Sequence, residues 1–139
     1  MRRSIIILIV VAGCSFQPLD QPQSIVHRVE NEILYRDDAL DGYWQLPEET
    51  EMLGTGDCED IAILAINRLA ELGYQAGLAL LRATDAAGTV YWHAAVWMDG
   101  TVIGSLRTVV RLDWQVRRII SHAAVMKWIE RTRVERGYA

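Results

Sequence analysis

Apolar residues recur at helical spacing in three segments of the chain, which predicts three amphipathic helices. The segments are residues 24–35, 57–72 and about 119–134, each with apolar positions three and four residues apart. The middle helix has the clearest limits, because Asp57 is a good N-cap residue and Gly73 follows the last apolar position. In the last helix, the residues expected to face the core are Ile120, Ala124, Trp128 and Ile129.

Strand-like patterns fill the interval between the second and third helices. Residues 75–84, 90–98 and 101–106 predict three strands, and the pair Asp99-Gly100 is a strong two-residue hairpin signal. In the strand 90–98, the side chains on both faces are largely apolar. We therefore expect this strand to lie in the middle of the sheet, with both faces covered. Residues 37–56, rich in turn formers and acids, predict a long ordered loop. The expected fold is α+β, with helices packed on a small antiparallel sheet.

The first residues have the pattern of an export signal. Arg2 and Arg3 precede an apolar run at residues 5–12, which is shorter than the roughly 20 residues needed to cross a bilayer. The run ends at the sequence VAGC, which resembles a lipobox, so we expect cleavage after residue 13 and lipidation of Cys14. An ordinary secretory signal or a short buried helix is the alternative. Acyl chains such as palmitate on one residue make an effectively permanent anchor.

The predicted organisation is a signal peptide (1–13), a lipidated tether (14–23) and one globular domain (24–139). Ser15, rather than aspartate, follows the cysteine, which resembles Gram-negative lipoproteins sorted to the outer membrane. The expected location is therefore the cell envelope, with the outer membrane favoured over the inner. Removing Arg2 and Arg3 from the 14 basic residues leaves 12 against 18 acidic residues, a formal charge of about −6. That balance argues against nucleic acid or an anionic bilayer surface as a partner.

Cys58 is a lone thiol once Cys14 carries lipid. It begins the helix 57–72, where backbone donors and the helix dipole favour thiolate. His93, in the strand 90–98, is the residue available as its base, and a cysteine–histidine pair can transfer acyl groups. The alternatives are a cysteine that fills the core and a histidine satisfied within it. His27 and His122 are expected to be solvated.

The residues around Cys58 and His93 resemble the bacterial transglutaminase-like cysteine peptidases, a branch of the papain-like superfamily, over roughly residues 37–106. The resemblance rests on Gly56, Asp57, Cys58, Glu59, Asp60, Ile61 and Ala62, with Leu69, Leu72 and Gly73 closing the helix; on Asp41, Trp44, Pro47 and Glu48 upstream; and on His93, Ala94, Ala95 and Val96. It implies a papain-like fold in which Cys58 is the nucleophile and His93 the base.

One position departs from the family pattern. In the family, a strand after the histidine carries an aspartate that orients the imidazole, and here Gly104 stands at that place. Ser105 is a weak substitute acceptor, Asp99 is expected to point to solvent, and Asp113 reaches the site only if the chain folds back. Loss of the orienting carboxylate lowers the rate of a triad enzyme by about four orders of magnitude.

Three acidic residues next to the thiol, Asp57, Glu59 and Asp60, have two interpretations. The resemblance implies calcium at these carboxylates, because the family includes calcium-dependent proteases and calcium takes oxygen ligands. The alternative is capping of the helix start. Their charge also opposes the dipole and raises the pKa of the thiol. For the oxyanion we expect the backbone N–H of Cys58, with Trp44 or Gln45 as a second donor.

The sequence thus predicts a lipid-anchored thiol hydrolase that cleaves peptide or side-chain amides in a protein or peptide substrate through an acyl-enzyme. Transfer to an amine and glutamine deamidation use the same intermediate. No cofactor beyond calcium is implied, and the oligomeric state stays open. A catalytically weak or inactive pseudoenzyme, serving as a binding module and marked by Gly104, is the alternative. A purely structural envelope lipoprotein is the third hypothesis, and it leaves the acidic residues unexplained.

Overall fold

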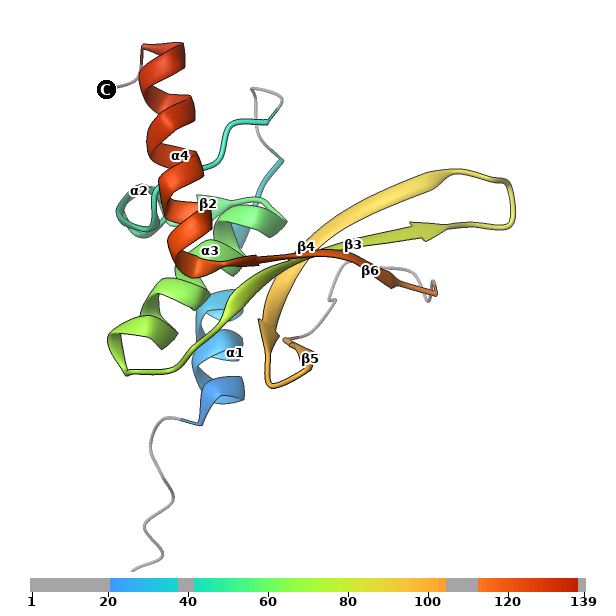
Figure 1. Ribbon diagram of the computed structural model, residues 1–139, viewed down its shortest axis with the longest axis horizontal. Coiled ribbons are helices and arrows are strands. Elements are labelled where there is room, and N and C mark those ends of the chain that lie inside the picture. The colour runs from blue at the N-terminus through green and yellow to red at the C-terminus, as the bar shows by residue number, and fades with distance from the viewer. Residues whose placement is uncertain (1–20, 38–41, 105–112, 138–139) are drawn as a thin grey trace, which may run out of the picture.

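Four helices and two sheets make up the described part of the chain, residues 21–37, 42–104 and 113–137, in this computed structural model (Figure 1). The helices are α1 (Pro22–Glu32), α2 (Pro47–Leu53), α3 (Cys58–Glu71) and α4 (His122–Arg136). The main sheet contains β3 (Gly77–Thr84), β4 (Val90–Met98), β5 (Thr101–Ile103) and β6 (Gln115–Ser121). A parallel pair joins β1 (Leu34–Tyr35) to β2 (Thr55–Gly56). The α+β class is confirmed.

The main sheet is antiparallel throughout, in the order β5-β4-β3-β6. Helix α3 packs against β3 and β4 and contacts the other three helices, so it is the centre of the fold. Its stripe of Ile63, Leu64, Ile66 and Leu69 is at most 1% exposed, and full burial of each such side chain contributes about 1.5–3 kcal/mol. None of the described helices is long and apolar enough to cross a membrane.

The two faces of β4 have different neighbours. Ala94, Val96 and Met98 belong to the main core with α3, whereas Ala95 packs with Ala79 and Leu81 of β3 on the opposite face. The second half of β4 is thus buried on both faces, as expected for a central strand. The first half is exposed, with 62% of Trp92 accessible, because the β3–β4 hairpin projects past the helices (Figure 1). The expectation of coverage was therefore wrong for residues 90–92.

The predicted hairpin turn at Asp99-Gly100 is confirmed. Asp99 has a φ of 50° and Gly100 a φ of 80°, the left-handed pair that a tight two-residue turn requires. The helix 57–72 is confirmed as α3. Of the predicted strand 101–106, residues 101–103 form β5, and residues 105 and 106 lie outside the described part.

Three predicted segments differ from the structure. Helix α1 begins at Pro22, so the end of the expected tether is already helical. Residues 37–56 contain α2 and β2, because Pro47 stands at the first position of a helix instead of breaking one. Residues 115–121 form β6, so the last helix begins at His122; Ile129 faces the core as expected, but Ala124 is exposed.

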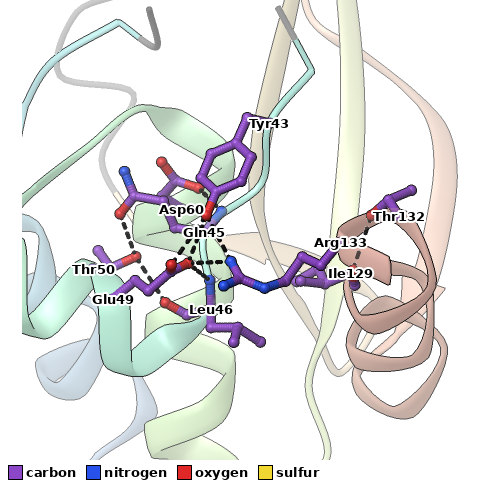
Figure 2. A network of polar contacts seen from close by, with 9 residues as sticks. All are labelled: Tyr43, Gln45, Leu46, Glu49, Thr50, Asp60, Ile129, Thr132 and Arg133. Atoms are coloured by element: carbon purple, nitrogen blue, oxygen red, sulfur yellow. Dashed lines mark hydrogen bonds and ion pairs between the residues drawn. The ribbon is translucent and has the colours of Figure 1, made fainter. Parts of the chain in front are cut away.

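A polar network joins α4 to the loop before α2 (Figure 2). The Arg133 guanidinium lies 2.6 Å from the Glu49 carboxylate and 2.6 Å from the Tyr43 hydroxyl. Glu49 also accepts the backbone N–H of Leu46 at 2.9 Å. Burial opposes the charge on Glu49, but the Leu46 N–H and the Arg133 guanidinium outweigh it, so the pKa of Glu49 is below its ordinary value. The network thus holds the loop before α2 against α4.

Candidate functional site

The amino terminus of α3 is held by two reciprocal side-chain caps. The Asp57 carboxylate accepts the N–H of Asp60 at 3.4 Å, and the Asp60 carboxylate accepts the N–H of Asp57 at 3.3 Å. Gly56 allows this close approach, because a Cβ there would lie 2.7 Å from the Cβ of Asp60. The local sequence therefore fixes where α3 begins and where Cys58 stands.

Asp60 also connects α3 to the preceding loop. Its side chain is fully buried and accepts the Gln45 backbone N–H at 2.8 Å, while the Thr50 hydroxyl donates to the Gln45 side-chain oxygen at 3.0 Å (Figure 2). These bonds hold Asp60 and Gln45 in the protein interior. Asp60 thus serves the helix start, as the capping interpretation expects.

Cys58 is the first residue of α3, and its thiol has two hydrogen-bond partners. The thiol donates to the Glu59 carboxylate at 3.1 Å and accepts the backbone N–H of Ala94 at 3.4 Å. Burial raises the pKa of the Cys58 thiol, and the charge of Glu59 raises it further, while the Ala94 N–H acts in the opposite direction. The helix dipole was expected to lower the pKa of the Cys58 thiol, but burial and the charge of Glu59 outweigh it. The resting state is a neutral thiol.

His93 precedes the residue whose N–H meets the thiol. Register places His93 on the sheet face of Ala95, where its ring centroid lies 5.8 Å from that of Trp114. Burial lowers the pKa of the imidazole, and the carboxylates of Glu59 and Glu30 raise it in part. The net shift is downward, so His93 is neutral at physiological pH and able to accept a proton.

One cavity of about 410 Å³ is lined by both Cys58 and His93. It lies between α1, α3 and the β4–β5 edge, where β5 pairs only with residues 96–98 and leaves the edge at Ala94 for the thiol. Among the described residues no hydrogen bond joins the thiol to the imidazole, since the thiol proton is directed to Glu59. The structure thus brings the predicted pair to one cavity in an uncoupled resting arrangement.

Aliphatic side chains form most of the cavity wall. They include Val26, Ile33, Ile61, Ala62, Val96 and Ile103. The polar residues Glu30, Asn31, Glu32 and Tyr35 also line it, as does Gly104. Glu30 and Tyr35 were not predicted from the sequence, because both belong to the α1–β1 segment, far from the cysteine motif in the chain.

The expected third member of a triad is not a side chain of β5. Ser105 lies outside the described residues, Asp99 is exposed in the hairpin turn, and Asp113 is exposed. Gly104 has a φ of +111°, and a Cβ there would lie 2.6 Å from Oε1 of Glu30. The carboxylate of Glu30 thus occupies the space into which a side chain at 104 would extend.

The predicted calcium ligands do not all converge. Asp57, Cys58 and Glu59 each place a ligand atom within 4.8 Å of the others, whereas Asp60 is buried in the helix cap. The converging set supplies two carboxylates and one sulfur, and calcium takes six to eight oxygen ligands. These residues fit calcium poorly. The cap bonds of Asp57 and Asp60 instead support the capping interpretation.

Of the expected oxyanion donors, the Cys58 N–H lies at the thiol, whereas Trp44 and Gln45 do not line the cavity. The Cys58 N–H is at the first position of α3, where helix N–H groups have no acceptor inside the helix. Trp44 and Gln45 do not line the cavity: the Trp44 ring packs on Trp128 at a centroid distance of 4.2 Å, and the Gln45 N–H donates to Asp60. The Gln45 N–H is therefore already bonded, and neither residue lines the cavity that holds the thiol.

The two other histidines have separate environments. His27 is 58% exposed and lies 3.7 Å from the Glu30 carboxylate, as expected for a solvated residue. The Nε2 atom of His122 is buried, with no hydrogen-bond partner within the described residues. The expectation of solvation was therefore wrong for His122, which begins α4 against the sheet.

The chain matches no family model, no curated protein and no solved structure. The resemblance to transglutaminase-like peptidases, with its papain-like fold, therefore stays a prediction that rests on the residues around Cys58 and His93.

Proposed function

We propose that the chain is a thiol hydrolase of the cell envelope, held at the outer membrane by lipid on Cys14, that cleaves peptide or side-chain amides. Cys58 is the nucleophile and His93 the general base. The observation that carries the proposal is the shared cavity: the thiol meets the N–H of the residue after His93, and both side chains line the same space of about 410 Å³. The neutral state of His93 suits a base.

Acyl transfer begins when the Cys58 S–H turns from Glu59 to His93 and the S–H bond breaks, with the proton passing to the imidazole. The sulfur then bonds to the carbonyl carbon of the substrate, and the carbonyl oxygen gains the negative charge. As the carbon–nitrogen bond breaks, His93 gives its proton to the leaving amine. Water then attacks the thioester while His93 takes a proton from it, and the carbon–sulfur bond breaks to restore the thiol.

The backbone supplies the stabilisation of the developing oxyanion. The Cys58 N–H stands at the positive end of the α3 dipole. The Ala94 N–H now bound to sulfur is the second donor near the reacting atom, in place of the expected Trp44 or Gln45. Removing one such donor in a hydrolase lowers turnover by about 10²–10³.

A second candidate is the pseudoenzyme that uses the cavity for binding. It is favoured by one observation, the hydrogen bond that the thiol donates to Glu59 at 3.1 Å, because this contact and burial favour the protonated thiol. In this alternative, Cys58 is a packing residue at the cavity wall. The two candidates differ in whether Cys58 becomes acylated.

Acylation by p-nitrophenyl acetate tests the proposal without a known substrate. The full-length chain in detergent micelles should release a burst of nitrophenolate and carry acetyl on the tryptic peptide 37–68, which contains Cys58 and not Cys14. Cys58→Ala should lose the burst. His93→Gln should slow it by about 10²-fold, the contribution of a general base.

The matched control is His122→Gln, because His122 belongs to α4 and does not line the cavity. It should leave the burst unchanged. Acetylation of peptide 37–68 at the same rate in wild-type and His93→Gln chains would contradict the proposal and favour the binding module.

A further inference from the structure

The cavity at Cys58 has a polar mouth and an apolar interior. Its exposed lining residues include Asn31, Glu32 and Tyr35. All the described lining residues that are buried are aliphatic, and they include Val26, Ile33, Ala62, Ala65, Val96 and Ile103. A ligand that enters past the thiol therefore meets hydrocarbon.

Helix α3 gives the direction and length of this interior. Cys58, Ile61, Ala62 and Ala65 all line the cavity, and their spacing of three and four residues places them along one face of the helix. Cys58 and Ile61 are partly exposed, whereas Ala62 is 5% exposed and Ala65 is fully buried. The cavity thus runs inward from the thiol along about two turns of α3, a distance of about 10 Å.

The length and composition of the interior favour a linear alkyl chain. With carbon–carbon bonds of about 1.5 Å, an extended chain of about eight carbons spans this distance. A leucine side chain would fill only part of it. A peptide that entered farther would bury N–H and C=O groups against aliphatic side chains, which costs free energy.

The charge at the thiol favours a neutral ligand. The Glu59 carboxylate lies 3.1 Å from the sulfur of Cys58. A free fatty acid would bring its own carboxylate next to Glu59, and like charges in contact repel. The carbonyl of an amide carries no such charge, so an acylated amine fits this position better than a free acid.

We propose that the cavity binds the linear aliphatic acyl chain, about eight carbons long, of an acylated amine, with the carbonyl carbon at Cys58. The inference rests on the proposed function and names its substrate class. The Cys58 sulfur bonds to the acyl carbon, the carbon–nitrogen bond breaks, and the leaving amine takes its proton from His93. Water then hydrolyses the thioester, which restores the thiol and releases the fatty acid.

The chain-length preference of the acylation burst tests the proposal in the full-length chain, in micelles of a steroid detergent without a long alkyl chain. The rate with p-nitrophenyl octanoate is divided by the rate with p-nitrophenyl acetate, so partition into micelles affects every variant alike. Ala62→Leu narrows the cavity and should lower this ratio about 10-fold or more, the loss of about two buried methylenes. The control is Ala70→Leu, the same change on α3 outside the cavity lining, which should keep the wild-type ratio.

Protection of Cys58 by unreactive amides tests binding without turnover. Octanamide should slow iodoacetamide incorporation into peptide 37–68, at a pH where the thiol alkylates, and acetamide at the same concentration should not. Each methylene in between should strengthen protection about three- to fourfold. This measurement needs no substitution, so it decides the matter even where Ala62→Leu does not fold.

The outcomes separate the acyl-chain site from the hydrolase. An unchanged octanoate-to-acetate ratio in a folded Ala62→Leu chain overturns the site, and so does equal alkylation in octanamide and acetamide. Protection by N-acetyl-leucinamide as strong as by octanamide overturns it in favour of a peptide ligand. Protection by octanamide in a chain that p-nitrophenyl acetate does not acylate supports the site and refutes the hydrolase.

Discussion

Replacing Glu59 by glutamine should make the Cys58 thiol more reactive. In the structure, the thiol donates to the Glu59 carboxylate at 3.1 Å, and that charge is the second cause, after burial, of the raised pKa of Cys58. Glutamine keeps the length and an acceptor oxygen but removes the charge. Ionisation of the thiol then no longer places two negative groups in contact, so the thiolate becomes more populated at neutral pH.

The size of the effect follows from the lost charge on the acceptor of the thiol hydrogen bond. A hydrogen bond to a charged group contributes about 1.5–3 kcal/mol, and about 1.4 kcal/mol is a tenfold change in ionisation. A thiol of lower pKa is also a weaker nucleophile, which removes roughly half of the gain on a logarithmic scale. Alkylation at about pH 7 should therefore accelerate roughly 4- to 15-fold.

The assay follows iodoacetamide incorporation into peptide 37–68 by mass spectrometry. The control is Glu71→Gln, which makes the same charge change at the far end of α3, where Glu71 is exposed and bonded to Asn67. It should alkylate like the wild-type chain. An unchanged or slower rate in Glu59→Gln would refute the assignment of Glu59 as the carboxylate that accepts the thiol hydrogen bond and raises the thiol pKa.

Three further predictions concern stability. Asp60→Asn should lower the free energy of unfolding in urea by about 2–4 kcal/mol, because the amide turns a donor toward the N–H groups that Asp60 accepts; a loss below about 0.5 kcal/mol would contradict the cap. Gly56→Ala should cost about 1–3 kcal/mol in thermal unfolding through the 2.7 Å contact with Asp60, and an unchanged melting temperature would argue against it. Arg133→Gln should cost about 1–2 kcal/mol near pH 7. Because the pKa of Glu49 is lowered in the fold, this difference is present above the ordinary carboxyl pKa and shrinks as pH falls through the folded pKa; a gap that stays constant in acid would oppose the ion pair.

The elements that the sequence predicted well have their signals within a few residues. Helix α3 has a cap at Asp57, a continuous apolar stripe and Gly73 after its end, and the turn before β5 is an Asp-Gly pair. Such features act locally, so the sequence shows them directly. The first turn of α2 was missed because Pro47 is favourable at the start of a helix and unfavourable only inside one.

Strand β6 was missed for a different reason. Its side chains are mostly exposed, with Arg117 and Arg118 between Val116 and Ile119, so neither a helical nor a clean alternating pattern appears. The strand is held by backbone pairing with β3 across a shift at Leu80 and Leu81. Pairing of that kind depends on a partner far away in the chain, which a local pattern does not encode.

Some features of the site also follow from local sequence, and others depend on how distant segments pack. The position of Cys58 at a helix start and of His93 on a strand follows from local sequence, but their shared cavity depends on how α3 meets β4 at Ala94. The state of the thiol depends on burial and on Glu59, which together outweigh the helix dipole. Glu30 reaches the cavity only through the packing of α1, so no motif spacing pointed to it.

The most direct test of the central claim, that Cys58 and His93 act as one unit, is the pH dependence of Cys58 alkylation in wild-type and His93→Gln chains, read on peptide 37–68. Burial and Glu59 keep the isolated thiol protonated, so reactivity near pH 7 requires a base. If His93 is the base for Cys58, His93→Gln lowers the rate near pH 7 by about 10-fold or more, while both chains converge at high pH. Superimposable profiles, with reaction only in alkali, would contradict it and identify Cys58 as an inert residue of a binding cavity.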